Sequence, residues 1–139
     1  DTLRLEMGYP LYGHELDQET TPVEAGFGDM IRLDIPREFA GSAALRAAKP
    51  AKRLVGIVLD GRRAAREGAA ILIGGANAGK VTSGAFGPSV GSAVAMGYMP
   101  GAEAPAPGTV VELEAGSARL TGKIAAMPMY AKATARMEI

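Results

Sequence analysis

Six short runs of β-forming residues follow Pro50, and glycine or proline separates them from one another. Many short strands with turn residues between them are typical of an antiparallel barrel or sandwich. The sequence after Pro50 therefore predicts one of these two folds. The runs are residues 53–58, 70–73, 80–83, 93–98, 109–114 and 119–125.

The last two runs have the pattern of a β-hairpin. Apolar or small residues at 120, 122 and 124 alternate with Arg119, Thr121 and Lys123. Side chains of a strand point alternately to its two faces, so this run should have one apolar and one charged face. The Ala-Gly-Ser sequence at 115–117 is suited to the turn.

The first fifty residues have a different texture. Residues 3–7 fit a helix and a strand about equally. Residues 14–24 predict an ordered loop, whose acids we expect to be solvated; they are Glu15, Asp17, Glu19 and Glu24. Residues 30–35 alternate as in a strand, and residues 38–48 are mostly good helix formers that a following proline should end.

Composition and charge argue against several classes of protein. The 15 basic and 15 acidic residues cancel, so we expect no nucleic-acid partner and no membrane partner. The chain has no cysteine and a single histidine, which argues against a metal site. No apolar stretch approaches the roughly 20 residues of a membrane-spanning helix, and no signal peptide is recognisable. We therefore expect a cytoplasmic protein, and the start at Asp1 suggests a fragment or a processed product.

The N-terminal segment contains a long, ungapped series of motifs. Residues 3–17 include L-R-L-E and L-Y-G-x-E-L-D, and residues 20–26 include T-P-x-E-A. The series continues with F-x-G-x-x-A-L at 39–45, G-x-V-T-S-G at 79–84 and A-x-G-Y at 95–98. These motifs, in this order, closely resemble the T-protein (aminomethyltransferase) family of the glycine cleavage system.

The chain departs from the family pattern at three places. The family often has tryptophan near 28–30, serine at position 87 and K-P-F-Y where this chain reads M-P-M-Y at 127–130. These differences bear on substrate identity more than on fold.

The resemblance implies an α+β chain of two parts. Residues 1–50 would be the C-terminal part of the central folate-binding domain, and residues 51–139 a small six-stranded antiparallel β-barrel. The implied reaction moves a one-carbon unit from aminomethyl-lipoyl H-protein to tetrahydrofolate and releases ammonia. Alternatives are a folate-dependent demethylase of a small methylated substrate and a non-catalytic folate-binding relative. Partners would be lipoylated H-protein and the upstream half of the same protein.

The resemblance also suggests three residues that contact tetrahydrofolate. Arg4, the arginine of L-R-L-E, offers a planar donor fork that suits a carboxylate or a carbonyl; otherwise it is a surface arginine paired with Glu6 or another acid. Tyr12 would line the folate channel or simply pack its loop. Arg136 would reach the channel from the C-terminal tail or lie at a solvated end. The family's catalytic aspartate lies upstream, so we expect no catalytic residue in this chain.

The glycine-rich sequence at 74–80 imitates a phosphate-binding loop. Val81 stands where such a loop needs serine or threonine, and the sequence leads into a strand instead of a helix. We therefore predict a hairpin turn at these glycines.

Overall fold

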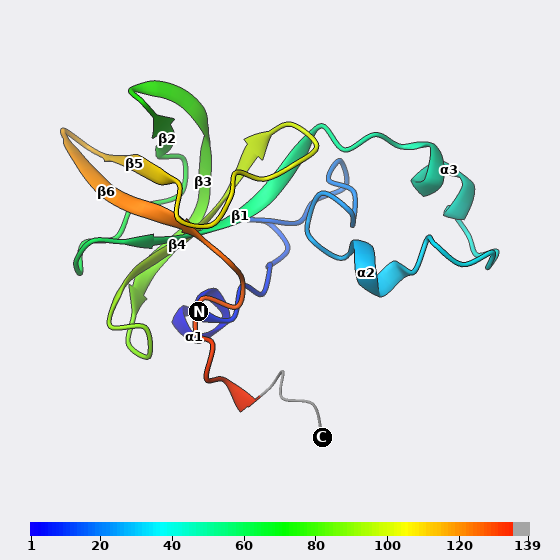
Figure 1. Cartoon of the computed structure of the whole chain (residues 1–139), viewed down its shortest axis with the longest axis horizontal. Helices are drawn as coiled ribbons and strands as arrows, with labels where there is room; N and C mark the ends of the chain where they lie inside the picture. The colour runs from blue at the N-terminus through cyan, green and yellow to red at the C-terminus, as the bar shows by residue number, and fades with distance from the viewer. Residues whose placement is uncertain (135–139) are drawn as a thin grey trace.

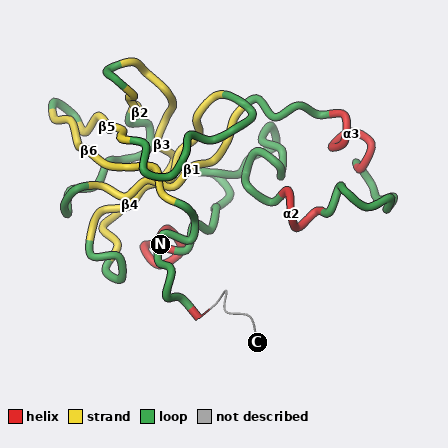
Figure 2. The backbone as a smooth tube through the Cα atoms, viewed as in Figure 1, coloured by secondary structure: helices red, strands yellow, loops and turns green. Residues whose placement is uncertain are grey.

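The computed structural model describes residues 1–134 and consists of three short helices and six strands. Figures 1 and 2 show the strands gathered into one body and α2 and α3 beside it. The helices are α1 (Thr2–Glu6), α2 (Gly28–Ile31) and α3 (Ser42–Ala47), and the strands are β1 (Lys52–Leu59), β2 (Ala70–Ile73), β3 (Ala76–Gly87), β4 (Ser92–Pro100), β5 (Val110–Ala115) and β6 (Ala118–Ala125).

The six strands form a closed barrel in the order β1-β4-β3-β2-β5-β6, and every pair is antiparallel. This confirms the predicted six-stranded antiparallel barrel. The β5–β6 hairpin closes with Ala115 opposite Ala118, next to the expected turn. The β2–β3 hairpin turns at Gly74 and Gly75, whose φ angles of 57° and 82° favour glycine. The glycine-rich sequence is therefore a hairpin turn.

The interior of the barrel is filled by alternate residues of the strands. In β1, for example, Val55, Ile57 and Leu59 are buried in one cluster with residues from β2 to β6. In β6 the buried Gly122 and Ile124 alternate with exposed Thr121 and Lys123, as the sequence predicts. Gly122 is required by close packing, because a Cβ there would lie 2.6 Å from a backbone oxygen of β1.

A second apolar cluster lies outside the barrel, between α1 and strands β1 and β4. It contains Leu5 of α1 with Leu54, Val94 and Met96. Because α1 covers this part of the sheet, β4 is buried on both faces. The ambiguous segment 3–7 is thus helical, and the burial of Leu5 against the barrel fixes its position.

The segment from 27 to 48 extends away from the barrel (Figure 1). The predicted strand at 30–35 is wrong: α2 occupies its start, and Arg32 then turns the chain with φ 52°. The predicted helix at 38–48 is shortened to α3, which begins after Gly41 at φ 85°. Within residues 1–134, no helix has the length and apolar character needed to cross a membrane.

Candidate functional site

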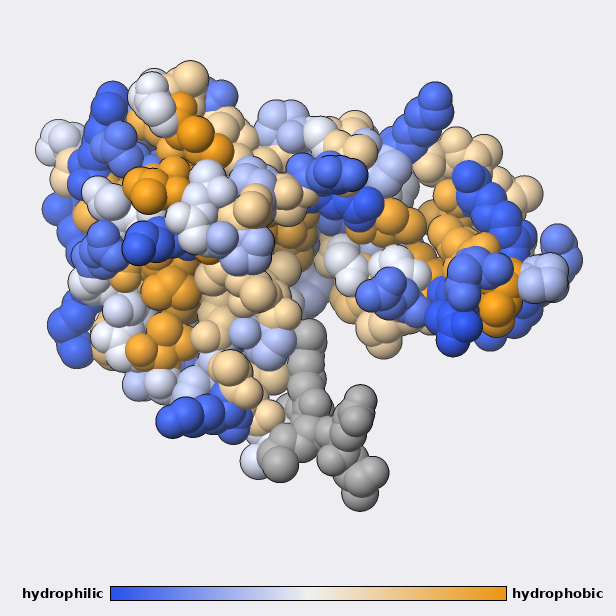
Figure 3. All heavy atoms as spheres, in the orientation of Figure 1, coloured by the Kyte–Doolittle hydropathy of each residue, from blue (hydrophilic) through white to orange (hydrophobic). Residues whose placement is uncertain are grey.

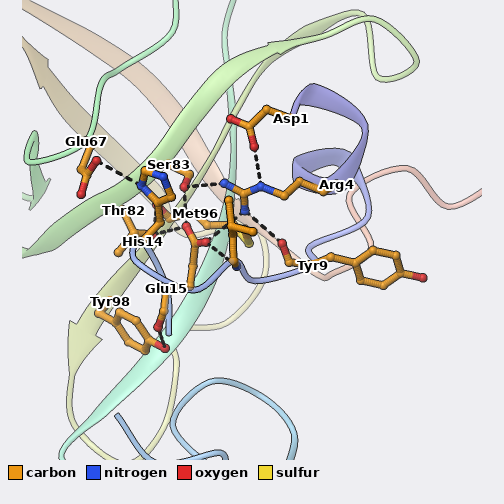
Figure 4. Close-up of polar contacts among 11 residues, drawn as sticks. Asp1, Arg4, Tyr9, His14, Glu15, Glu67, Thr82, Ser83, Met96 and Tyr98 are labelled. Atoms are coloured by element: carbon orange, nitrogen blue, oxygen red, sulfur yellow. Dashed lines mark hydrogen bonds and ion pairs between the residues drawn. The ribbon is translucent and has the colours of Figure 1, made fainter. Parts of the chain in front are cut away.

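Arg4 lies at the junction between α1 and the barrel, and its side chain is only 15% exposed. Its Nη1 donates to the carbonyl of Tyr9 and to Oε2 of Glu15, both at 3.0 Å. Its Nη2 donates to Ser83 Oγ at 3.0 Å, and its Nε donates to the carboxylate of Asp1. Figure 4 shows the guanidinium between these acceptors. Arg4 is therefore held in one orientation by groups from the helix, the following loop and β3.

Glu15 is the buried partner of Arg4, with a side chain that is 0% exposed. Its Oε1 accepts hydrogen bonds from Thr82 Oγ1 at 2.7 Å and Ser83 Oγ at 2.5 Å. Its Oε2 accepts from the Leu11 amide at 3.0 Å as well as from Arg4. Four donors thus converge on one carboxylate, which is the arrangement that a buried charge requires.

A β-bulge explains how two consecutive residues of β3 reach the same carboxylate. In a regular strand Thr82 and Ser83 would point to opposite faces. The pairing of β3 with β4 shifts register between Val81 and Ser83, so one extra residue is inserted there. A bulge of this kind redirects side chains, and here both hydroxyl groups point to Glu15 (Figure 4).

The electrostatics of the cluster favour an ionised Glu15. Burial raises the pKa of the Glu15 carboxyl, but hydrogen bonds from Ser83, Thr82 and the Leu11 amide, together with the charge of Arg4, outweigh burial and lower that pKa overall. The Glu15 carboxylate therefore stays charged at neutral pH.

Tyr98 fixes the backbone of the same loop. Burial, followed by the charges of Glu15, Glu24 and Asp17, raises the pKa of the Tyr98 hydroxyl. The hydroxyl therefore stays protonated and donates to the Glu15 carbonyl at 2.9 Å.

The prediction of a solvated acidic loop is wrong for two of its four acids. Glu15 and Glu24 are 1% and 6% exposed, while Asp17 and Glu19 are exposed. Glu24 accepts from the Ala51 amide at 2.9 Å, immediately before β1, and from the amide of Thr21 at 2.9 Å.

A sequence signal for the burial of Glu24 was available. The Glu24 amide donates back to Thr21 Oγ1 at 3.3 Å, so the two residues form the reciprocal pair of a capping box. The spacing T-x-x-E at 21–24 is the sequence signature of that pair.

Glu6 is a third buried carboxylate that links the N-terminal segment to the barrel, and it is 2% exposed. Its Oε1 accepts from the amides of Ser89, at 2.6 Å, and Val90, at 3.1 Å, in the turn between β3 and β4. Glu6 does not pair with Arg4 in the contacts described above, so the acids that hold Arg4 are Asp1 and Glu15. Charge pairing within α1 is therefore not what buries Glu6.

An open pocket of about 400 Å³ lies beside this cluster. Polar groups dominate its lining, and the side chains of His14 and Glu67 lie within hydrogen-bonding distance there, with 3.1 Å between Nδ1 and Oε2. The lining residues are Asp1, His14, Arg66, Glu67, Thr82, Ser83 and Gly84. The pocket gives solutes access to the Asp1 side of the Arg4 cluster.

The other predicted folate contacts are not brought into the Arg4 cluster. Tyr12 is 67% exposed, and its backbone pairs with that of Leu16 in an isolated parallel bridge. Arg136 lies outside the described residues. Within residues 1–134, no three His, Cys, Asp or Glu side chains are grouped so that they could hold a metal ion.

Comparison with known proteins gives a consistent family match. The family model "Glycine cleavage T-protein C-terminal barrel domain" matches residues 52–131, which include all six strands. The aminomethyltransferase of Saccharopolyspora erythraea is 46% identical over 134 residues, covering 94% of this chain and 36% of that protein. The aminomethyltransferase of Rubrobacter xylanophilus is 48% identical over 103 residues, covering 72% of this chain and 28% of that protein.

A solved structure agrees with these sequence matches. The crystal structure of glycine cleavage system aminomethyltransferase T from Bartonella henselae superposes with a TM-score of 0.73 at 32% identity. The superposition covers 93% of this chain and 37% of that one, so the chain spans little more than a third of the length of the Saccharopolyspora and Bartonella proteins. On the family match and the shared barrel, this chain belongs to the glycine cleavage T-protein family, of which it represents the C-terminal part.

Proposed function

We propose that this chain serves as the C-terminal part of a tetrahydrofolate-dependent aminomethyltransferase of glycine cleavage. The reaction moves a one-carbon unit from aminomethyl-lipoyl H-protein to tetrahydrofolate and releases ammonia. The reacting groups outside the cofactor would come from the upstream part of the protein, and a cytoplasmic location belongs to the same proposal. The relatives named above carry the name aminomethyltransferase, which favours this reaction over demethylation of a small methylated substrate.

The observation that carries the proposal is the state of the Arg4 guanidinium. Its contacts with Tyr9, Glu15, Ser83 and Asp1 account for four of its five N–H groups, which leaves one on Nη2 within the described part of the chain. The Nε group is paired with Asp1, whose side chain is 64% exposed and can be displaced. The free Nη2 N–H and the Nε N–H would together suit a carboxylate or carbonyl oxygen of the cofactor.

Tyr12 supports the proposal in a second way. Its ring is exposed beside the loop that carries Glu15, and an aromatic face is suited to packing against a flat heterocycle such as a pterin. Arg136 remains part of the proposed cofactor contacts, although it lies beyond the described residues.

The segment from 27 to 48, which extends away from the barrel, also supports an association with further polypeptide. Met30 is 76% exposed and Ile35 is 36% exposed, and Figure 3 shows apolar side chains on the surface of this extension. Contiguous exposed apolar surface marks interaction sites more often than free surface. We propose that residues 1–50 complete a folate-binding domain whose other part lies upstream, and that residues 51–139 form the separate barrel domain.

The test is ammonia release from aminomethylated H-protein by the full-length gene product, with and without tetrahydrofolate. Turnover that requires tetrahydrofolate is expected. Arg4→Ala should weaken tetrahydrofolate binding by about 1 to 3 kcal/mol, the worth of a charge-assisted hydrogen bond, or roughly fivefold to 150-fold. Turnover without tetrahydrofolate, or unchanged cofactor affinity in Arg4→Ala, would contradict the proposal.

A further inference from the structure

We infer that Glu15 is the positioning residue for Arg4, and that β3 of the barrel controls cofactor affinity through it. The inference rests on the proposed role of Arg4 in tetrahydrofolate binding. In this arrangement Glu15 does not contact the cofactor. It fixes the direction of the guanidinium by accepting from Nη1 at 3.0 Å while its own position is set by the barrel.

Glu15 has little freedom to move. Its carboxylate is 0% exposed and takes two hydroxyl donors from the β3 bulge and one amide donor from Leu11. Its backbone is fixed as well, because its amide donates to the Leu11 carbonyl at 3.0 Å and its carbonyl accepts from Tyr98 at 2.9 Å. A change of rotamer would leave several buried donors without a partner, at a cost for each.

Ser83 closes a ring of hydrogen bonds between Arg4 and Glu15. Ser83 Oγ accepts from Arg4 Nη2 at 3.0 Å and donates to Glu15 Oε1 at 2.5 Å. The guanidinium and the carboxylate are therefore joined twice, directly through Nη1 and indirectly through Ser83. Two attachment points fix the plane of the guanidinium, whereas a single contact would leave it free to rotate.

The two acids that contact Arg4 differ in their exposure to solvent. Asp1 is 64% exposed and approaches from the N-cap position of α1, so a ligand carboxylate can take its place without leaving a buried charge unpaired. A ligand cannot replace Glu15 in this way, because the Glu15 carboxylate is fully buried. One side of the guanidinium is thus anchored to the barrel, and the other is available to an anionic ligand.

The experiment measures the tetrahydrofolate Kd of the full-length gene product by calorimetry in four variants: Glu15→Gln, Arg4→Ala, the double variant and Glu19→Gln. Glu15→Gln keeps the shape of the side chain and removes its charge. Glu19→Gln makes the same change at an exposed site of the same loop and serves as the matched control. We expect Glu15→Gln to raise Kd about tenfold, as for a misplaced binding group, and Glu19→Gln to leave it unchanged.

The double variant separates positioning from an independent effect. If Glu15 acts through Arg4, then Kd in the double variant equals that of Arg4→Ala alone. The inference would be overturned if the Kd increases of the two single variants multiplied in the double variant, or if the Kd of Glu15→Gln equalled that of Glu19→Gln. Either result would leave the proposed function standing. An unchanged Kd in Arg4→Ala would instead overturn the proposed function. A general loss of stability would lower the melting temperature without producing this pattern.

Ser83→Ala provides a second route if Glu15→Gln does not fold. It removes a single hydroxyl, and with it the indirect link between Arg4 and Glu15. A rise in Kd of about twofold to fivefold is expected, in keeping with the loss of one hydrogen bond, and it should vanish in the Arg4→Ala background. An unchanged Kd in Ser83→Ala would contradict the positioning role.

Discussion

Replacing Glu24 by glutamine tests how strongly its carboxylate fastens the N-terminal segment to β1. The carboxylate is 6% exposed and accepts from the Ala51 amide at 2.9 Å, the Thr21 amide at 2.9 Å and Thr21 Oγ1 at 3.1 Å. Glutamine has only one acceptor oxygen, so in either orientation its NH₂ group faces a backbone N–H. One hydrogen bond to a charged acceptor is lost, which costs about 1.5 to 3 kcal/mol.

The measurement is thermal unfolding of this chain at pH 7, followed by circular dichroism. At roughly 4 °C per kcal/mol for a chain of this size, Glu24→Gln should lower the melting temperature by about 6 to 12 °C. Glu19→Gln, on the exposed part of the same loop, should change stability by no more than about 0.5 kcal/mol. Equal melting temperatures for the two variants would refute the reasoning that Glu24 holds the segment through buried hydrogen bonds.

Two further predictions concern pH and packing. For Glu15 and Glu24, burial raises the pKa, but hydrogen bonds and nearby positive charge outweigh it, so both folded-state pKa values lie below the ordinary 4.5. The stabilisation that the two carboxylates provide is therefore complete above pH 4.5 and is lost as pH falls through the lowered pKa values. The unfolding free energy should fall less steeply with decreasing pH in Glu24→Gln than in the unsubstituted protein. Equal slopes of unfolding free energy against pH in the two proteins would contradict this. Gly97→Ala would place Cβ 2.5 Å from the Lys80 carbonyl oxygen, so it should lower the free energy of unfolding, measured with urea, by about 1 to 3 kcal/mol. Gly28→Ala serves as the control: its Cβ would lie 4.0 Å from the nearest side chain, and its free energy of unfolding should be almost unchanged.

The strands and turns of the barrel could be predicted from the sequence because their signals are local, whereas the choice of a barrel over a sandwich came from the family resemblance. The alternation in β6 and the glycines of the β2–β3 turn depend only on neighbouring residues, and the bounds of β2 agree with the predicted run 70–73. Strand β3 is longer than the predicted run 80–83, since pairing with β4 extends it across residues of low strand propensity such as Gly84 and Gly87. Pairing with a neighbouring strand thus overrides local propensity.

The failed strand at 30–35 has a physical reason in the closure of the barrel. A run with alternating residues becomes a strand only where a neighbour offers free backbone groups. Strand β1, the next strand along the chain, already pairs with β4 on one side and β6 on the other. The closed sheet leaves no edge for another strand, so α2 and a turn satisfy the backbone locally: the amides of Met30 and Ile31 donate to the Phe27 carbonyl.

The same closure explains why the buried acids escaped prediction. A barrel without edges cannot hold an N-terminal segment by strand pairing. The segment is attached instead through N–H and O–H groups that do not take part in backbone hydrogen bonds between the strands. Glu6 takes turn amides between β3 and β4, Glu15 takes hydroxyl groups at a bulge, and Glu24 takes the amide just before β1. Composition does not distinguish Glu15 from the exposed Glu19, because what differs is a donor pair 67 and 68 residues further along the chain. The residue type predicts a charge, and the distant bulge decides that this charge is buried beside Arg4.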